Sequence, residues 1–279
     1  MQYMRMVTPK LDHEINQLCR EMEGFEAAAS VANTGTGARR EGKQFEQWVA
    51  RLWRAFRRAA EAGGAQAEVV AGVGARRYAK LTVETRSIFV PTWKEDPVTD
   101  PNAERSRWLE VAFGVSDLIG AFPTEAEAIR QYAPQTGFYA GANYPALYNG
   151  LTTKFDDTVV LVDGHVLREK ILLEYKTAKS SAGRQVDGNA HERLSFQIMQ
   201  YLEVATRYTK CSLMVIANGA FVRYRNKYHV NFHVQADRLT NFGWFSMQHA
   251  CTVAEYTRFL TGLLAWLFEG TPRVGWSAR

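Results

Sequence analysis

The chain has few of the features that mark a secreted or membrane protein. Its 279 residues include three cysteines that share no CxxC or CxxH spacing: Cys19, Cys211 and Cys251. An odd, scattered set of this kind excludes a disulfide scaffold and a zinc site, and it favours reduced thiols. The first residues lack an apolar signal segment, and the apolar run from Phe259 to Phe268 is about half of the ~20 residues that span a bilayer. We therefore expect a cytoplasmic protein with no membrane partner.

A phosphate-binding loop of the GxxxxGK(S/T) type is also missing. The stretch around Gly37 and Lys43 lacks that spacing, and no hydroxyl residue follows the lysine. We therefore expect no nucleotide cofactor. The charge balance is only mildly basic, because 34 Lys and Arg residues stand against 29 Asp and Glu residues, a net charge of +5. This excess is compatible with a polyanionic partner.

What the sequence does contain is a series of helix and strand patterns without internal repeats. Residues 43–62 predict a helix, because five apolar residues recur at intervals of three and four: Phe45, Trp48, Val49, Leu52 and Phe56. Gly63–Gly64 end this helix, and residues 35–40 read as a flexible, basic approach to it. Further strands are predicted within residues 69–90, 211–218 and 222–234, and further helices at 190–207 and 253–268.

A β-hairpin between residues 154 and 178 is the clearest unit. Asp163–Gly164 is a turn dipeptide between two strand-like runs, KFDDTVVLV and REKILLEYKTA. Glu174 and Lys176 are two residues apart, so they project from one face of the second strand. The aliphatic residues around them predict burial, which costs several kcal/mol per ion unless the charges are paired or bind a metal. Carboxylates from both strands could hold a hard divalent cation and support phosphodiester hydrolysis.

Asp156 or Asp157, followed by Glu174-x-Lys176, resembles the PD-(D/E)xK nuclease signature, with Phe155 where the family often has proline. This superfamily includes type II restriction endonucleases, RecB-like exonucleases and Holliday-junction resolvases. The resemblance implies an α/β fold with a restriction-endonuclease-like core, a central mixed β-sheet flanked by helices that carries the motif on a hairpin. It also implies Mg²⁺ as cofactor and double-stranded DNA as substrate. It covers residues 150–208 well, and the 43–62 helix loosely.

Three further residues extend the resemblance. Glu46 lies in GKQFEQWVARLW, on a helix where many family members place an additional metal-binding Glu. Gln197 and Tyr201 match the QxxxY pattern that RecB-like nucleases carry on the helix after the Lys. The alternative is that these residues have structural roles alone: Glu46 as a solvated helix residue, Tyr201 as a core residue and Gln197 as a boundary residue.

The sequence offers two successive aspartates where the family uses one. Successive strand residues face opposite sides, so only one of them can point at a metal. Asp156 takes the motif position if Phe155 replaces proline, whereas Asp157 directly precedes Thr158 and the valine run. The position after Phe155 favours Asp156 slightly, and both aspartates stay candidates.

Basic residues on both sides of the motif are candidate contacts to the DNA backbone: Arg39, Arg40, Lys179, Arg184 and Arg193. Simple solvated charge explains the arginine-rich face of the 43–62 helix equally well.

We expect one domain over residues 1–279, with an N-terminal helical elaboration over about 1–42 and a catalytic core over about 43–279. The favoured hypothesis is a Mg²⁺-dependent type II restriction endonuclease that acts as a homodimer or higher homo-oligomer, because two sites are needed to cut both strands of a palindromic sequence. A RecB-like or phage-type exonuclease is the first alternative. A non-catalytic DNA-binding module with structural hairpin charges is the second.

Overall fold

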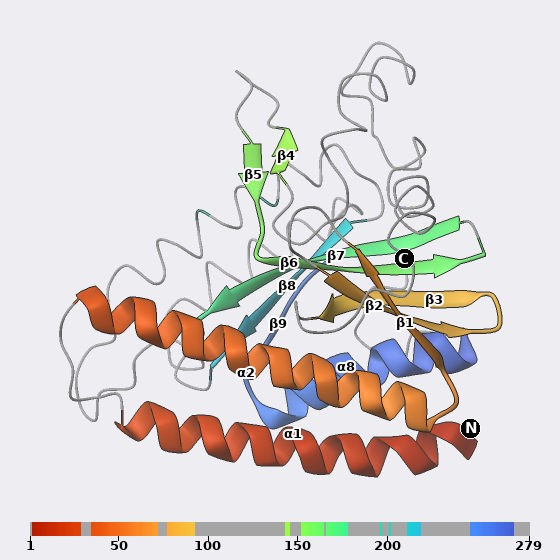
Figure 1. Ribbon diagram of the computed structural model, residues 1–279, viewed down its shortest axis with the longest axis horizontal. Helices are drawn as coiled ribbons and strands as arrows, with labels where there is room; N and C mark the ends of the chain where they lie inside the picture. The colour runs from red at the N-terminus through yellow and green to blue at the C-terminus, as the bar shows by residue number, and fades with distance from the viewer. Residues whose placement is uncertain are drawn as a thin grey trace.

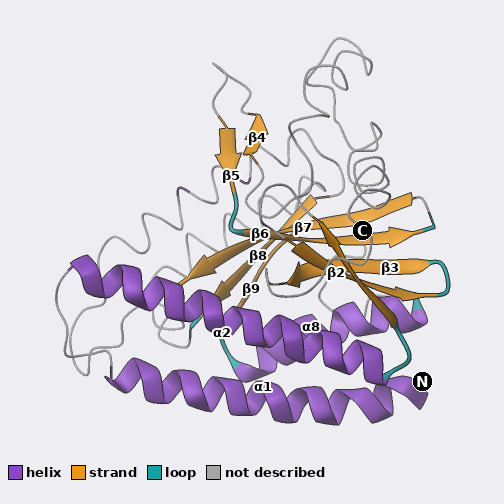
Figure 2. Ribbon diagram, viewed as in Figure 1, coloured by secondary structure: helices purple, strands orange, loops and turns teal. Residues whose placement is uncertain are grey.

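The computed structural model describes residues 2–28, 35–71, 77–92, 143–145, 152–164, 166–177, 196, 201, 211–218 and 246–270. Within these ranges the protein is an α/β structure with a mixed, open sheet and three long helices, two of them N-terminal (Figures 1 and 2). The predicted α/β class and the N-terminal helical elaboration are therefore confirmed. None of the helices in these ranges combines the length and the apolar character that crossing a bilayer requires.

Seven of the described strands form the sheet in the order β1-β2-β3-β6-β7-β8-β9. Their bounds are Gln66–Ala71 for β1, Arg77–Val83 for β2, Arg86–Thr92 for β3, Asp157–Asp163 for β6, Val166–Lys176 for β7, Cys211–Ala217 for β8 and Ser246–Ala250 for β9. Each of the first five strands in this order, β1, β2, β3, β6 and β7, pairs antiparallel with the next one, whereas β7, β8 and β9 run parallel. Strands β4 (Asn143–Pro145) and β5 (Thr152–Lys154) form a separate antiparallel pair. The β6–β7 hairpin thus lies in the middle of the main sheet.

Helices α1 (Gln2–Ala28), α2 (Gly35–Ala62) and α8 (Val253–Glu269) lie on one side of the sheet (Figure 1). The apolar stripe predicted for residues 43–62 is the buried side of α2, as expected for an amphipathic helix on a sheet. It packs with apolar residues of α1, α8 and the sheet in one core cluster. Trp48 on α2 also donates from Nε1 to the Leu18 carbonyl of α1 at 2.8 Å, which fixes the two helices side by side.

The approach to α2 differs from the prediction. Residues 35–40 belong to the helix itself, so the expected flexible segment is wrong. Alanine, arginine, glutamate and lysine between residues 38 and 43 are strong helix formers, and they outweigh the cost of about 1 kcal/mol for each glycine. The predicted end at Gly63–Gly64 is confirmed, because Gly64 has a φ of 98° that suits glycine.

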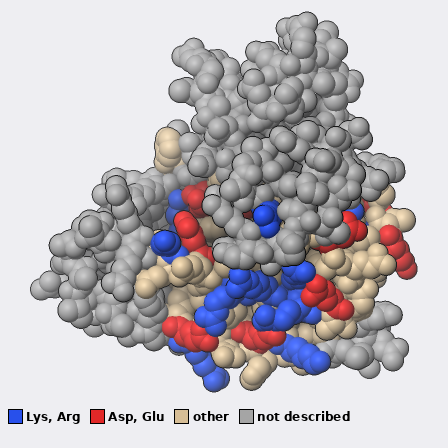
Figure 3. Space-filling view, viewed as in Figure 1, with Lys and Arg blue, Asp and Glu red and all other residues tan. Residues whose placement is uncertain are grey.

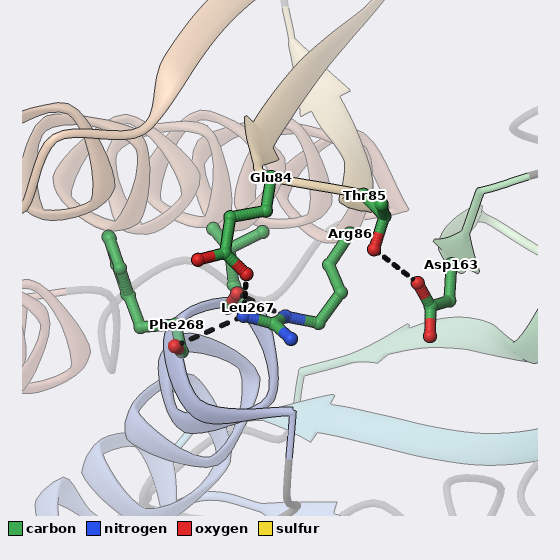
Figure 4. Close-up of polar contacts among 6 residues, drawn as sticks. All are labelled: Glu84, Thr85, Arg86, Asp163, Leu267 and Phe268. Atoms are coloured by element: carbon green, nitrogen blue, oxygen red, sulfur yellow. Dashed lines mark hydrogen bonds and ion pairs between the residues drawn. The ribbon is translucent and has the colours of Figure 1, made fainter.

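Helix α8 confirms the predicted helix at residues 253–268 and is closed at both ends. Thr252 and Glu255 form a capping box at its start, and Gly270 adopts a left-handed conformation at its end. Arg86, at the start of β3, donates from Nε to the Leu267 carbonyl at 2.9 Å and from Nη2 to the Phe268 carbonyl at 3.2 Å (Figure 4). A cation at this end also complements the helix dipole.

The two faces of the hairpin strands contact different surroundings. Side chains that point to the helices are apolar and join the core cluster: Val159, Leu161, Ile171 and Leu173. The alternate side chains point to the other face, as strand geometry requires, and they are also buried although they lie outside that cluster: Thr158, Val160 and Leu172. Of the charged residues of the predicted motif, Asp157 and Glu174 are buried, whereas Asp156 and Lys176 are partly exposed.

Candidate active site on the β6–β7 hairpin

The hairpin has the strands and the turn that the sequence predicts. β6 and β7 pair antiparallel from Asp157 opposite Leu173 to Asp163 opposite Val166, with a register shift at Leu161/Val162. Gly164 stands in the turn with a φ of 62°, a left-handed conformation that glycine adopts without strain. This turn holds the open ends of the two strands in one register, and those ends carry the motif.

Asp156 and Glu174 bring their carboxylates together on the face away from the helices. Asp156 directly precedes β6, and its N–H donates to the Leu173 carbonyl at 3.1 Å. The backbone N–H of Tyr175 donates to Asp156 Oδ2 at 2.8 Å, which aims this carboxylate along the neighbouring strand. The Asp156 charge contributes to the raised pKa of Glu174, as expected for like charges in close proximity.

Glu174 is a buried carboxylate with an incomplete set of partners. It is 5% exposed, and its Oε1 forms an ion pair with Lys176 Nζ on the same face of the strand. Burial, followed by the Asp156 charge, raises the pKa of Glu174 to about 7, and Lys176 opposes this shift. Glu174 Oε2 is buried and receives no hydrogen bond from a donor among the described residues, while a hydrogen bond between the Glu174 and Asp156 carboxyl groups adds to the raised pKa of Glu174. The side chain therefore has an oxygen available for a ligand.

These residues fit a hard divalent cation. Mg²⁺ is commonly held by one or two carboxylates together with water and substrate phosphate, rather than by a complete protein cage. Asp156 and Glu174 provide two carboxylates, and the described ranges contain no group of three acidic, histidine or cysteine side chains that could surround an ion. A cation between them would offset their mutual repulsion and use the unpaired Oε2.

Asp157 points to the opposite face. It is 4% exposed, and its carboxylate accepts hydrogen bonds from the Thr158 N–H at 3.1 Å and the Tyr175 hydroxyl at 3.2 Å. Tyr175 is packed against the core cluster beneath the helices, where burial and then the Asp157 charge raise its pKa well above the usual value. Of the two aspartates, only Asp156 therefore shares a face with Glu174 and Lys176.

The other predicted site residues are not brought to this pair in the described structure. Glu46 is exposed on α2, which packs on the opposite face of the sheet, and no hydrogen bond or ion pair joins it to another described residue. Tyr201 is helical and fully buried, whereas Gln197 lies outside the described residues.

Most of the predicted DNA-contacting residues lie outside the part of the chain that the structure describes. Lys179, Arg184 and Arg193 lie outside the described residues, and Arg39 and Arg40 are placed in α2 by their backbone alone.

The arginine-rich face of α2 is described, and it is shared with acidic residues of α1. Figure 3 shows blue basic side chains gathered on this side of the molecule with red acidic ones among them. Arg51 pairs with Glu21 at 2.5 Å, and Arg58 pairs with Glu14 at 2.6 Å. This face therefore joins two helices, which favours the solvated-charge reading over DNA contact.

Sequence reasoning missed the hydrogen bonds of Tyr175 to both aspartates and the partly buried pair of Glu169 with Ser212. Ser212 Oγ donates to Glu169 Oε1 at 2.5 Å across β7 and β8. The parity of β7 could have placed Tyr175 and Glu169 on the face opposite Glu174. The pairing partner Ser212 could not be found in this way, because it depends on the register of a parallel strand far along the chain.

The chain matches no protein-family model, no curated protein and no solved structure.

Proposed function

We propose that the protein is a Mg²⁺-dependent nuclease that hydrolyses phosphodiester bonds in double-stranded DNA, with its active site on the β6–β7 hairpin. The observation that carries the proposal is the arrangement of Asp156, Glu174 and Lys176 on one face of the β6–β7 hairpin. Two adjacent carboxylates, one with a buried unpaired oxygen, suit a divalent cation, and an ammonium group beside them suits a phosphate.

Each residue then has a defined task. Asp156 and Glu174 would hold Mg²⁺, which when bound polarises the phosphate and lowers the pKa of a water molecule. Lys176 Nζ, held beside Glu174, would orient the attacking water or stabilise negative charge that develops on the phosphate oxygens. The burial of Glu174 limits the access of bulk water and strengthens these charge interactions.

Within this class we favour a type II restriction endonuclease of the PD-(D/E)xK superfamily, with a restriction-endonuclease-like core. The mixed sheet and the central position of the motif hairpin support this choice. The protein would act as a homodimer or higher homo-oligomer, and parts of the chain around the core would read base edges in the major groove.

A RecB-like exonuclease shares the same centre. The buried, helical Tyr201 is compatible with the QxxxY pattern of those enzymes, but it fits a core position equally well. Digestion of several circular and linear plasmids with Mg²⁺ separates the two activities. Discrete fragments are expected for a site-specific endonuclease, whereas a smear or loss from the ends alone would indicate an exonuclease.

The same assay decides between a nuclease and a non-catalytic DNA-binding module. Glu174→Ala and Lys176→Ala should each reduce cleavage about a thousandfold or more, which corresponds to roughly 4 kcal/mol in the activation free energy. Both should keep DNA binding in Ca²⁺. Lys80→Ala is a matched control, because Lys80 is a partly buried lysine on β2 that pairs with Glu68. Unchanged cleavage in Glu174→Ala and Lys176→Ala, or no cleavage by the wild type, would contradict the proposal.

A further inference from the structure

Asp157 and Tyr175 form a polar contact directly behind the candidate active site, on the side of the helices. The Tyr175 hydroxyl donates to Asp157 Oδ2 at 3.2 Å, and the Thr158 N–H donates to Oδ1 at 3.1 Å. Asp157 is 4% exposed. A buried carboxylate is costly unless it is hydrogen-bonded, and these two donors offset that cost.

Tyr175 contacts both aspartates, one through its backbone and the other through its side chain. Its backbone N–H, which lies in the plane of the sheet, donates to Asp156 Oδ2 at 2.8 Å, while its hydroxyl reaches Asp157 on the helix-covered face. Asp156 lies just before the first paired residue of β6, where a single backbone hydrogen bond, from its N–H to the Leu173 carbonyl, ties it to β7. The Asp157–Tyr175 contact adds a side-chain tie between the two strands at this last position of the ladder, next to Asp156.

We infer that Asp157 and Tyr175 are a positioning pair that holds the Asp156 carboxylate beside Glu174 in a geometry suited to a divalent cation. Neither residue touches the cation, because both side chains point to the other face. Groups that orient metal ligands in this way commonly change metal affinity by 10- to 100-fold when they are removed. The inference rests on the proposed function, since it assigns these residues to the same metal centre.

The test is a direct measurement of Mn²⁺ binding to the DNA-free protein by calorimetry, together with the melting temperature of each variant. Tyr175→Phe removes the hydroxyl and keeps the ring, so it should weaken Mn²⁺ binding about tenfold. Asp157→Asn can accept from the Thr158 N–H with its oxygen and donate to the Tyr175 hydroxyl with its amide, so it should change affinity less than about threefold, whereas Asp156→Asn should remove measurable binding, a loss of about 100-fold or more.

Tyr78→Phe is the matched control, because it removes a tyrosine hydroxyl that is fully buried on β2, separated from β7 by β3 and β6. It should leave Mn²⁺ affinity unchanged. Cleavage by Tyr175→Phe should recover to within about threefold of the wild type at saturating Mn²⁺, which loss of folded protein would not allow.

Three results would contradict the inference, and they differ in what they say of the nuclease proposal. If Asp157→Asn loses binding as completely as Asp156→Asn, Asp157 is itself a ligand. If the wild type binds Mn²⁺ and Tyr175→Phe binds it equally well, the positioning role is wrong while the nuclease proposal stands. If the wild type neither binds Mn²⁺ nor cleaves DNA, both fail together.

Discussion

Two glutamates on β7 have the same raised pKa, about 7, on opposite faces of the sheet and for different reasons. Glu169 faces the helix side, where burial raises its pKa and the hydroxyl of Ser212 partly opposes the shift. Glu174 faces the other side, where burial and the charge of Asp156 both raise its pKa and Lys176 opposes them.

The difference shows why a perturbed pKa alone does not locate a functional site. Glu169 has a hydroxyl donor that satisfies it, which is the arrangement of a structural carboxyl in a core. Glu174 has a second carboxylate beside it and a buried oxygen without a hydrogen bond in the described structure. Only the second arrangement would become more stable on binding a cation, so the neighbours of the group are more informative than the size of its shift.

The largest predicted effect is on the pH dependence of the free energy of unfolding. It should distinguish both of these groups from an ordinary glutamate. A pKa raised from 4.5 to about 7 means that the folded state holds a proton that the unfolded state has released. The free energy of unfolding should therefore fall as pH rises from about 4.5 to 7, by at most about 3 kcal/mol for each group. Urea unfolding of Glu169→Gln and Glu174→Gln across this interval should show a shallower fall than the wild type.

Each glutamine variant is the control for the other, since both replace a glutamate of β7 by an uncharged residue of the same shape. Above about pH 7 both should be more stable than the wild type, because neither has to bury a charge. A pH profile that stays as steep as that of the wild type in either variant would show that the group ionises near its ordinary pKa.

A smaller effect distinguishes the two faces directly. Mg²⁺ binds the ionised form of a carboxylate, so it should stabilise the wild type above about pH 7 and progressively less below it. At ten times its dissociation constant the ion adds about 1.4 kcal/mol to the free energy of unfolding. Glu169→Gln should keep this stabilisation, and Glu174→Gln should lose it. Equal stabilisation of both variants would contradict the candidate metal centre.

The sequence was sufficient for the elements that have a clear period or a turn signal. The stripe of α2, the Asp163–Gly164 hairpin, β8 and α8 all follow from local patterns that the tertiary structure preserves. Alternation along the strands also required that Asp156 and Asp157 face opposite sides. The choice between them needed the backbone of Tyr175, since the hydrogen bond to Asp156 comes from the partner strand.

Other features depend on contacts that no local pattern contains. Strand β9 was not predicted. It pairs in parallel with β8, and a parallel pairing of this kind leaves no turn signal between the two strands. The exposure of Glu46 is set by which side of α2 meets the sheet, and a helix pattern with an apolar stripe leaves the boundary positions open. The cap that Arg86 places on α8 joins residues about 180 positions apart, which sequence periodicity cannot predict.

The smallest predicted effect tests the structural side of the comparison. Ser212→Ala removes the hydroxyl that donates to Glu169 Oε1, so the pKa of Glu169 should rise further, because this hydrogen bond lowers it. The variant should lose about 1 kcal/mol in the free energy of unfolding at about pH 8, where Glu169 is ionised. The loss should be smaller at about pH 5, where the neutral carboxyl group needs the donor less. In the Glu169→Gln background the pH dependence of the Ser212→Ala effect should vanish, which a double-mutant cycle of urea unfolding measures. If that pH dependence persists without Glu169, the hydroxyl acts on another group, and Glu169 is not the satisfied counterpart of Glu174.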